Sequence, residues 1–540
     1  MKIKIVGFLI MTLLIGAAFP TVGIMHRNLN QENNPDCYFQ ENEFPTAGNG
    51  VVFDQQLDEN GGGYTVIGVW GSHYEMGYAQ AELLGDLPLE GLQEIKDSLG
   101  EDYDFARQVA ADTVWMPPGV EDEIRGMVDY LTATHPFADI DEIDIKVVQL
   151  ISEFWYQGCR SHTCWGRYVS DPVKTLSTLR LDWPVPISAL YHHVLCAHNP
   201  DDGSPKWATL GWPGVVAVTT GVNEFGTAIR LHDYKSFDID MTLGRISRGI
   251  ACRYALTYAT SSDVSTHLAD VYDELQNYEV MNGGFLNYYA PEGHGGVMTS
   301  HPYQSGPDFY NLRIPKSSWH HGEAMITTNS WTDGTYTPSD EDFGADAYYN
   351  DETPKTLQSH WDLLNTDSHG FRNLHLFSVA YRGPNDMTIW AQGKTSNSER
   401  TPRLEYEWDE LFSRPPTTPD ITGKTKGEAG EQYEYSFIST DPDGDDISYY
   451  INWEDGAITQ WTPYQPSGTP YSEKHTWSQG MYIIRAKSRD INGLESDITP
   501  YIVQMPKNKF YSKPSLLLLS KTFVNHFPLL EKILNQILKI

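Results

Sequence analysis

Gly158-Cys159 is the pair of residues in this sequence whose types and order are best suited to covalent chemistry. A thiolate at Cys159 could attack the carbonyl carbon of Gly158, and water would then hydrolyse the resulting thioester. Glycine before the nucleophile leaves the attacked carbonyl uncrowded. Cleavage would free the α-amine of Cys159, whose ordinary pKa is about 7.7–8.0, so one residue could supply both nucleophile and general base. The sequence therefore predicts self-cleavage between Gly158 and Cys159.

An acidic residue is expected beside this cysteine. Cys159 and Asp182 lie at nearly equal distances from the turn signal Ser170-Asp171-Pro172. If the flanking runs pair as an antiparallel hairpin, Cys159 and Asp182 would lie side by side. Asp182 would then orient the freed amine or stabilise its charged form. The alternative is that Asp182 merely ends a strand and Cys159 is a small buried residue.

Cys164 is the competing nucleophile, but no glycine precedes it. Positions 159 and 164 differ by an odd number, so in a strand their side chains point to opposite faces. We therefore expect Cys164 to be buried or disulfide-bonded. The five cysteines of the chain fit one reactive thiol with up to two disulfides in an exported protein, and they are Cys37, Cys159, Cys164, Cys196 and Cys252.

An ordered set of motifs resembles the acyl-CoA:6-aminopenicillanic acid acyltransferase-like family of N-terminal-nucleophile (Ntn) hydrolases, of peptidase C45 type. The resemblance covers about residues 60–395. The motifs that carry it are Gly71-Ser72-His73-Tyr74-Glu75-Met76-Gly77, Gly158-Cys159-Arg160-Ser161-His162-Thr163-Cys164, Leu179-Arg180-Leu181-Asp182-Trp183, Thr220-Gly221-Val222-Asn223-Glu224-Phe225-Gly226 and Ile326-Thr327-Thr328-Asn329.

The resemblance implies an α+β fold, an αββα sandwich of two antiparallel sheets between helical layers. It implies hydrolysis or transfer of an acyl group from a linear amide, with Cys159 and Asp182 as catalytic residues. Asn329 would donate a hydrogen bond to the developing oxyanion, an interaction worth roughly 2.7–4 kcal/mol in a transition state. The alternative for Asn329 is a turn-capping asparagine at the end of a strand.

Three positions depart from the family pattern. Leu179 stands where relatives often have arginine, and Arg180 stands where they have asparagine, so Arg180 is a candidate replacement in the site. An oxyanion-hole asparagine follows the Thr220–Gly226 turn in relatives, and His232-Asp233 occupies that place here. His232, Asp233 and Asn223 are therefore weaker candidates for substrate or oxyanion contacts.

Several elements must position these residues. Residues 64–70 read as a strand, residues 74–84 as the start of a helix, and residues 88–157 as mainly helical, with the strongest helical spacing at 145–156. From about residue 159 short strands dominate, with a helical stretch near 246–278 and a last hairpin at 374–391.

The composition predicts several domains. We expect an acyltransferase-like domain at 40–412, a Pro/Thr-rich linker at 413–419, and a small all-β sandwich at 420–505. That sandwich resembles a PKD-like or immunoglobulin-like module through its Asp441-Pro442-Asp443-Gly444-Asp445 run, which could bind calcium or form a tight turn. Residues 506–540 form a Lys-rich amphipathic tail that could lie on an anionic membrane or on the protein itself.

Export is expected from residues 1–25, which read as a signal peptide or an N-terminal anchor. The protein would be secreted or held at the cell surface. Its net charge is −34, from 38 basic and 72 acidic residues, which excludes nucleic acid as an expected partner. The expected partner is a small amide or acyl substrate, with membrane-surface or cell-wall contact through the tail and the sandwich.

We expect no cofactor and no metal. Two His-containing clusters follow no standard zinc-ligand spacing, and they are His192, His193, Cys196 and His198, and His320, His321 and Glu323. Two alternatives remain beside the amide hydrolase. One is a phospholipase-B-like acyl-lipid hydrolase, since related folds act on lipids. The other is a non-catalytic surface adhesion protein in which the sandwich binds and the larger domain is a degenerate scaffold.

Overall fold

The computed structural model divides the chain into two compact units, Met1–Arg414 and Pro415–Ile540. The division falls within the predicted linker at 413–419. The N-terminal apolar segment, the C-terminal tail, Asn329, His320 and His321 lie outside the described residues. The structure describes residues 46–58, 62–154, 158–182, 191–233, 244–258, 264–282, 284–300, 310–313, 323–328, 343–365, 373–395 and 400–506.

Two sheets form the centre of the first unit. All neighbouring strands in them pair antiparallel except β3 and β6, which are parallel. The larger sheet has the spatial order β1 (Thr46–Ala47), β2 (Gly50–Leu57), β3 (Gly63–Gly71), β6 (His192–Pro200), β7 (Trp207–Gly211), β8 (Thr220–Asn223), β9 (Ala228–Asp233), β10 (Gly284–Tyr289), β11 (Gly296–Ser300) and β12 (Tyr310–Arg313). The smaller sheet has the order β13 (Ala324–Thr328), β4 (Gly158–Trp165), β5 (Thr175–Asp182), β14 (Asn373–Gly383), β15 (Asp386–Gly393) and β16 (Leu404–Glu407).

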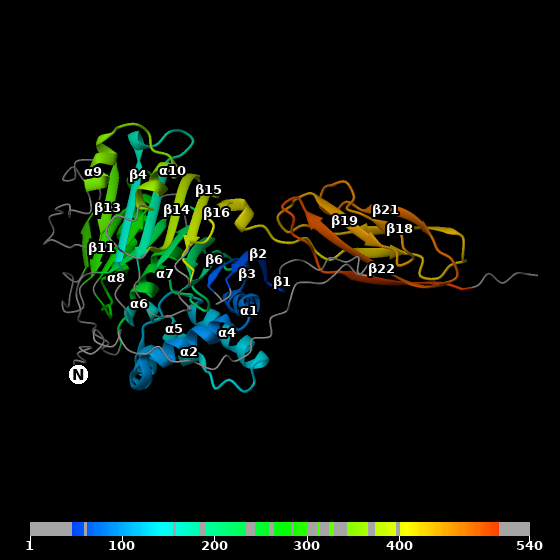
Figure 1. The fold of residues 1–540 in the computed structure, drawn as a ribbon, viewed down its shortest axis with the longest axis horizontal. Helices are drawn as coiled ribbons and strands as arrows, with labels where there is room; N and C mark the ends of the chain where they lie inside the picture. Colours follow the sequence, from blue (N-terminus) through cyan, green and yellow to red (C-terminus); the bar gives the residue numbers. More distant parts are fainter. Residues whose placement is uncertain are drawn as a thin grey trace, which may run out of the picture. The chain divides into compact units, whose positions relative to one another are not determined.

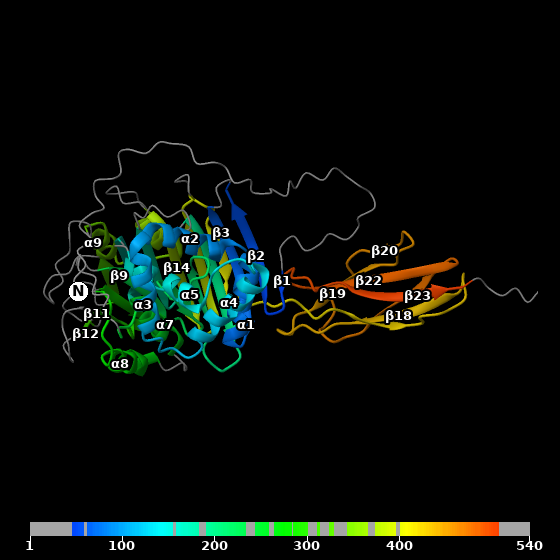
Figure 2. The same ribbon diagram turned by 90° about the horizontal axis from the view of Figure 1, so that it is seen from below.

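Most helices of the first unit lie on the outer sides of these sheets, and Figure 1 and Figure 2 show the strands between them. The short helix α11 is an exception, because its Trp408 and Leu411 side chains belong to the buried cluster between the sheets. Helices α1 and α7 pack on the larger sheet, while α10 packs on β4, β5 and β14 of the smaller one. The helices are α1 (His73–Leu84), α2 (Leu87–Leu99), α3 (Tyr103–Asp112), α4 (Val120–Thr134), α5 (Glu142–Val148), α6 (Ile151–Phe154), α7 (Arg248–Tyr258), α8 (Val264–Leu275), α9 (Phe343–Asn350), α10 (Leu357–Leu364) and α11 (Trp408–Leu411).

An apolar layer joins the facing sides of the two sheets. Val66 and Leu195 of the larger sheet share one buried cluster with Phe377, Val379 and Ile389 of the smaller sheet. The intervening residues of β14 point the other way, because side chains alternate along a strand. Leu376, for example, packs beneath α10 with Trp361. The first unit is therefore a mixed α+β structure in which two sheets face each other and helices cover both outer sides.

Most of the expected elements are present, with one correction among the helices. The predicted strand at 64–70 is β3, the helix at 74–84 is α1, and the hairpin at 374–391 is β14 and β15. The strong helical spacing at 145–156 does not give one continuous helix. Helix α5 ends at Val148 and α6 begins at Ile151. At the break, the backbone N–H groups of Gln149 and Leu150 bond to carbonyl oxygens three residues earlier, and the Gln149 side chain holds the backbone of residues 214–217.

The second unit is a sandwich of a three-stranded and a four-stranded sheet, and so the all-β expectation is correct. Three indole and phenol side chains, Trp453, Trp477 and Tyr435, form the centre of its buried cluster. The sheets have the orders β17 (Asp420–Gly423), β18 (Gln432–Ile438), β21 (Tyr471–Thr476), and β20 (Ile458–Thr459), β19 (Ile447–Asn452), β22 (Gly480–Asp490), β23 (Thr499–Met505).

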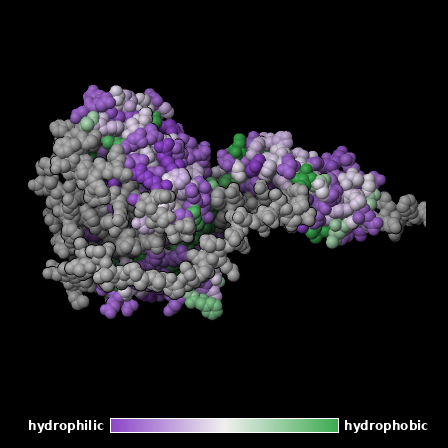
Figure 3. All heavy atoms as spheres, viewed as in Figure 1, coloured by the Kyte–Doolittle hydropathy of each residue, from purple (hydrophilic) through white to green (hydrophobic). Residues whose placement is uncertain are grey.

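The described surface is mainly hydrophilic, as Figure 3 shows for the face drawn there. Few large apolar side chains are exposed among the described residues, Phe137, Met481 and Ile491 being the most exposed. No helix in the described part of the chain is both long enough and apolar enough to span a membrane.

The Gly71–Gly77 motif builds the contact between α1 and α4. Ser72 and Glu75 cap the start of α1 reciprocally, which satisfies backbone N–H groups that would otherwise lack partners. A Cβ atom on Gly77 would lie 2.0 Å from the carbonyl oxygen of Glu123, and one on Gly126 would lie 2.1 Å from that of Tyr74. The two helices can therefore approach each other only because both positions are glycine.

Gly77→Ala should destabilise the protein by about 1–3 kcal/mol, because the new methyl group meets rigid backbone rather than a flexible side chain. Gly211→Ala is the control, since no heavy atom beyond the chain neighbours lies within 4 Å of the Cβ it would add. The measurement is the thermal unfolding midpoint of each variant. Equal midpoints for the two variants would contradict this account of the helix crossing.

Candidate functional site

Cys159 lies near the start of β4 and is only 7% exposed. Its side chain belongs to the buried apolar cluster that includes Leu179, Leu181 and Leu231. Ser161, two residues further along, contacts His232 of β9 in the larger sheet. Because residues two apart in a strand share a face, Cys159 lies on the side of β4 that faces the larger sheet.

The hairpin predicted around residues 170–172 is present, but its register differs by one residue from the expectation. Cys159 pairs with Leu181, and Asp182 pairs with Gly158. Cys159 and Asp182 therefore do not stand side by side, and their side chains leave the hairpin on opposite faces. The equal spacing from the turn could not resolve this single-residue difference. Asp182 is instead level with the peptide bond that self-cleavage would break.

Arg180 and Asp182 form a buried ion pair on the outer side of β5. Arg180 Nε lies 2.9 Å from Asp182 Oδ2, and Arg180 Nη1 donates to the carbonyl oxygen of Leu364 in α10 at 3.4 Å. Both side chains are buried. The pair occupies alternate positions of one strand, so the Arg180-Leu181-Asp182 order in the sequence is sufficient to bring the two charges together.

Four polar side chains meet between the two sheets, one layer below Cys159. Ser161 of β4 and Thr327 of β13 are direct cross-strand partners. Ser161 Oγ lies 2.9 Å from His232 Nε2 and 3.1 Å from the Tyr289 hydroxyl of β10. That hydroxyl also lies 3.1 Å from Thr327 Oγ1. We call Ser161, His232, Tyr289 and Thr327 the inter-sheet network.

Of the four residues in the inter-sheet network, only His232 is predicted as a site residue from the sequence. The interval of two between Cys159 and Ser161 could have indicated that Ser161 shares the face of the nucleophile. Nothing in the sequence indicates that Tyr289 reaches the same point, because it comes from the opposite sheet more than a hundred residues later.

The other residues suggested for oxyanion or substrate contacts lie in different surroundings. Asn223 donates through Nδ2 to the carbonyl oxygen of Leu256, and its Oδ1 accepts from the backbone N–H groups of Phe225 and Thr227. These bonds hold the turn between β8 and β9, so the Asn223 side chain has a structural role there. Asp233 ends β9 and pairs with Gly284. Asn329 lies outside the described residues and follows Thr328, which pairs with Arg160.

Cys164 lies on the opposite side of β4 from Cys159, as the odd interval predicts. It is fully buried beneath α9 and α10 in a cluster with Tyr168 and Tyr349, and burial raises the pKa of its thiol to about 12. Cys164, Cys196 and Cys252 carry no disulfide. Two disulfides from the five cysteines are therefore not formed, and Cys164 is a packing residue.

The histidines of β6 make separate contacts on alternate faces. His192 Nε2 lies 2.9 Å from Thr65 Oγ1, His193 accepts from the backbone N–H of Lys394, and His198 lies 3.4 Å from Cys196 Sγ. Across the described residues, no group of three or more histidine, cysteine, aspartate or glutamate side chains has the geometry to hold a metal ion. In the second unit, Asp441 accepts from the backbone N–H groups of Asp443 and Asp445, which is a tight turn.

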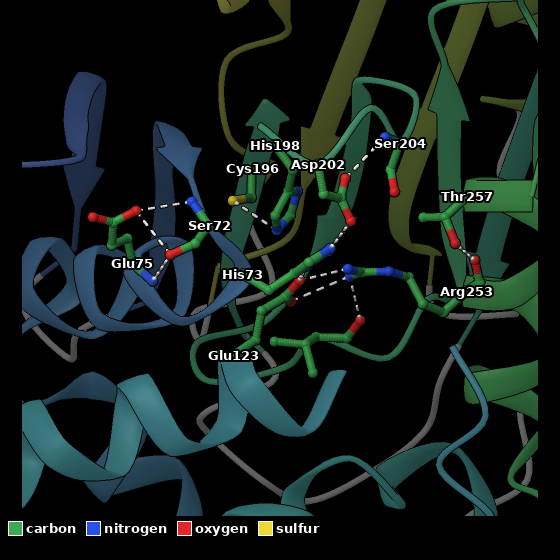
Figure 4. A network of polar contacts seen from close by, with 11 residues as sticks. Ser72, His73, Glu75, Glu123, Cys196, His198, Asp202, Ser204, Arg253 and Thr257 are labelled. Atoms are coloured by element: carbon green, nitrogen blue, oxygen red, sulfur yellow. Dashed lines mark hydrogen bonds and ion pairs between the residues drawn. The ribbon is translucent and has the colours of Figure 1, made fainter. Parts of the chain in front are cut away.

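A second buried polar cluster, drawn in Figure 4, joins α1, α4 and α7. Glu123 of α4 is 1% exposed and accepts from Arg253 Nη2 at 2.6 Å and Nη1 at 3.3 Å. His73 Nδ1 of α1 lies 2.6 Å from Glu123 Oε1. The Arg253 guanidinium also stands 4.1 Å from the centre of the Trp207 ring. A buried carboxylate is retained here because two cationic groups and an aromatic face surround it.

The charges in this cluster set the pKa values of its members. Burial opposes ionisation of Glu123, but the charge of Arg253 and the hydrogen bond to His73 outweigh it and lower its pKa. Burial also opposes protonation of His73, and Glu123 outweighs that effect and raises the pKa of His73 above 6.5. Asp202, whose side chain is 41% exposed, lies 3.3 Å from His73 Nε2 and acts in the same direction.

The His73 interaction should make stability depend on pH. Because its folded-state pKa is raised, the stabilisation is fully present below about pH 6.5 and is lost as pH rises through the folded-state pKa. His73→Gln should therefore lower the unfolding midpoint at pH 6 and approach the wild type at pH 9. His135→Gln, which removes an exposed pair with Asp86, is the control and should show little change. A constant difference between His73→Gln and wild type across this range would contradict the linkage.

Comparisons with known proteins identify only part of the chain. No protein-family model matches it, and no curated protein matches it. A structure described as the PKD domain of an M14-like peptidase from Thermoplasmatales archaeon SCGC AB-540-F20 is 44% identical, covers 18% of this chain and 99% of that chain, and has a TM-score of 0.17.

Two further solved structures are similar over similar shares of the chain. Fibronectin(III)-like modules of Clostridium thermocellum CbhA are 14% identical, over 25% of this chain and 70% of that chain, with a TM-score of 0.16. The PKD domain of the human VPS10 domain-containing receptor SorCS2 is 17% identical, over 18% and 79%, with a TM-score of 0.14. On the 44% identity to a nearly whole domain, this chain belongs, over 18% of its length, to the PKD family of immunoglobulin-like domains.

Proposed function

We propose that this protein is an exported, self-cleaving cysteine Ntn hydrolase of linear amides, with Cys159 as its nucleophile. The observation that carries the proposal is the position of Gly158-Cys159. The pair opens β4, Cys159 faces the larger sheet, and β4 is flanked by β5 on one side and β13 on the other. Two facing sheets covered by helices on both outer sides are also the arrangement that the family resemblance implies.

Asp182 takes a revised role in this proposal. Its strand position is level with Gly158 rather than with Cys159, so it is suited to the amine that cleavage would free rather than to the thiol. Arg180 binds the same carboxylate and holds it in place on β5. A carboxylate so held can orient the amine as it takes a proton from the thiol and later gives it to the leaving group.

The acylation step needs a donor for the developing oxyanion. Asn329 is our candidate, because it follows directly on β13, whose last residue Thr328 pairs with Arg160 next to the nucleophile. Water or an amine would then take the acyl group from the thioester. We propose a small amide or acyl compound as substrate and a secreted or cell-surface location, in keeping with the N-terminal segment and the PKD-like module.

Self-cleavage is tested by the masses and N-termini of the purified chain under denaturing conditions. Wild-type protein should give two fragments, the larger beginning with Cys159, and Cys159→Ala should remain one chain because it lacks the attacking thiol. Cys164→Ala is the matched control and should be cleaved like the wild type, since its thiol is buried on the other side of β4.

An intact wild-type chain would overturn the proposal and favour a surface-binding protein whose larger unit is a scaffold. A cleaved chain that releases fatty acid from phospholipid but no amine from an amide panel would instead favour the acyl-lipid hydrolase.

Asp182→Asn should lower stability, because the buried Arg180 loses its counter-charge, and in the folded protein it should lower kcat for amide hydrolysis roughly 100-fold. The reason is that an uncharged side chain no longer stabilises the protonated amine. The measurement is kcat and KM on acyl anilides, with circular dichroism to establish folding. A folded variant with wild-type kcat would remove Asp182 from the mechanism.

A further inference from the structure

The inter-sheet network joins both sheets at the level of the proposed site. Its four side chains come from four strands, two in each sheet, and none is more than 2% exposed. The bond from Ser161 to His232 and the bonds from Tyr289 to Ser161 and Thr327 each cross from one sheet to the other. Other polar pairs also cross between the sheets, namely Arg230 with Ser177, Thr220 with His375 and His193 with Lys394. Those pairs reach β5, β14 and the residue after β15, whereas the inter-sheet network reaches β4 and β13.

The position of the network along the strands links it to catalysis. Ser161 is two residues after Cys159 on β4, and Thr327 is two residues before Asn329, just inside the end of β13. Ser161 and Thr327 pair directly, and the single hydroxyl of Tyr289 bonds both. One phenol from the larger sheet therefore contacts both β4, which carries the proposed nucleophile, and β13, which ends one residue before the proposed oxyanion donor in the sequence.

We propose that Tyr289 and His232 are positioning residues that hold β4 and β13 at a fixed height above the larger sheet and so fix the position of Cys159 relative to the end of β13. This inference rests on the proposed function. The network lies below the reacting atoms and acts through Ser161 and Thr327. Loss of a positioning contact affects the transition state more than substrate binding, so kcat should fall while KM is retained.

The test uses Tyr289→Phe in the full chain, a change that removes only the hydroxyl. We expect slower self-cleavage and a kcat reduced on the order of 10- to 100-fold, with KM within about two-fold of wild type. Thr327→Val removes the same hydroxyl contact from the other side and should match it. Thr327→Ser keeps the hydroxyl and should recover most of the rate.

Thr178→Val is the matched control. Thr178 lies on the outer side of the same hairpin, is fully buried, and bonds His360 Nδ1 at 2.9 Å and Ser378 Oγ at 2.7 Å. It should lower the unfolding midpoint about as much as Tyr289→Phe while leaving kcat unchanged. An equal loss of rate in Thr178→Val, or a wild-type rate in Tyr289→Phe and Thr327→Val, would overturn this inference but not the proposed function. A wild-type chain without self-cleavage or amidase activity would overturn the proposed function, and the inference with it.

Discussion

Alternation of side chains along β4 is the constraint on which the arrangement of the first unit depends. Odd-numbered residues from Cys159 to Trp165 face the larger sheet, and the even-numbered residues face α9 and α10. The two faces have different chemistry. His162 lies on the outer face, where burial holds its pKa well below the usual value, while Ser161 joins the inner polar layer. A slip of one residue would exchange these environments and bury Cys159 beneath the helices.

The helical side of the larger sheet is held by a different kind of contact. Gly77 and Gly126 let α1 and α4 approach until the backbones touch, and this close crossing encloses Glu123. A buried carboxylate without partners would be strongly unfavourable. Arg253 reaches it from α7, and His73 reaches it from the first turn of α1. One ion cluster therefore ties three helices together, and a motif that resembles part of an enzyme signature has a structural basis in this fold.

Local sequence patterns were sufficient to predict many elements of this structure. They failed for the features that depend on contacts between residues far apart in the sequence. Alternation and turn residues predicted β3, the β4–β5 hairpin and the opposite faces of Cys159 and Cys164, because each depends only on neighbouring residues. The hairpin register was wrong by one residue, since spacing from a turn cannot distinguish adjacent registers. The break after α5 coincides with Gln149 bonding the carbonyl oxygen of Gly214, a contact that helical spacing does not predict. Tyr289 meets Ser161 only because the sheets stack, and Thr327 meets Ser161 through the pairing of β13 with β4. No local pattern encodes either contact.

The buried thiols determine whether the fold depends on the redox conditions around it. Cys164, Cys196 and Cys252 are enclosed by apolar and aromatic side chains and carry no disulfide, and burial raises the pKa of each thiol. A protonated, enclosed thiol reacts slowly with oxidants and with other thiols. The packing around these three residues therefore does not depend on the redox potential of the surroundings. It can form in a reducing compartment as readily as in an oxidising one.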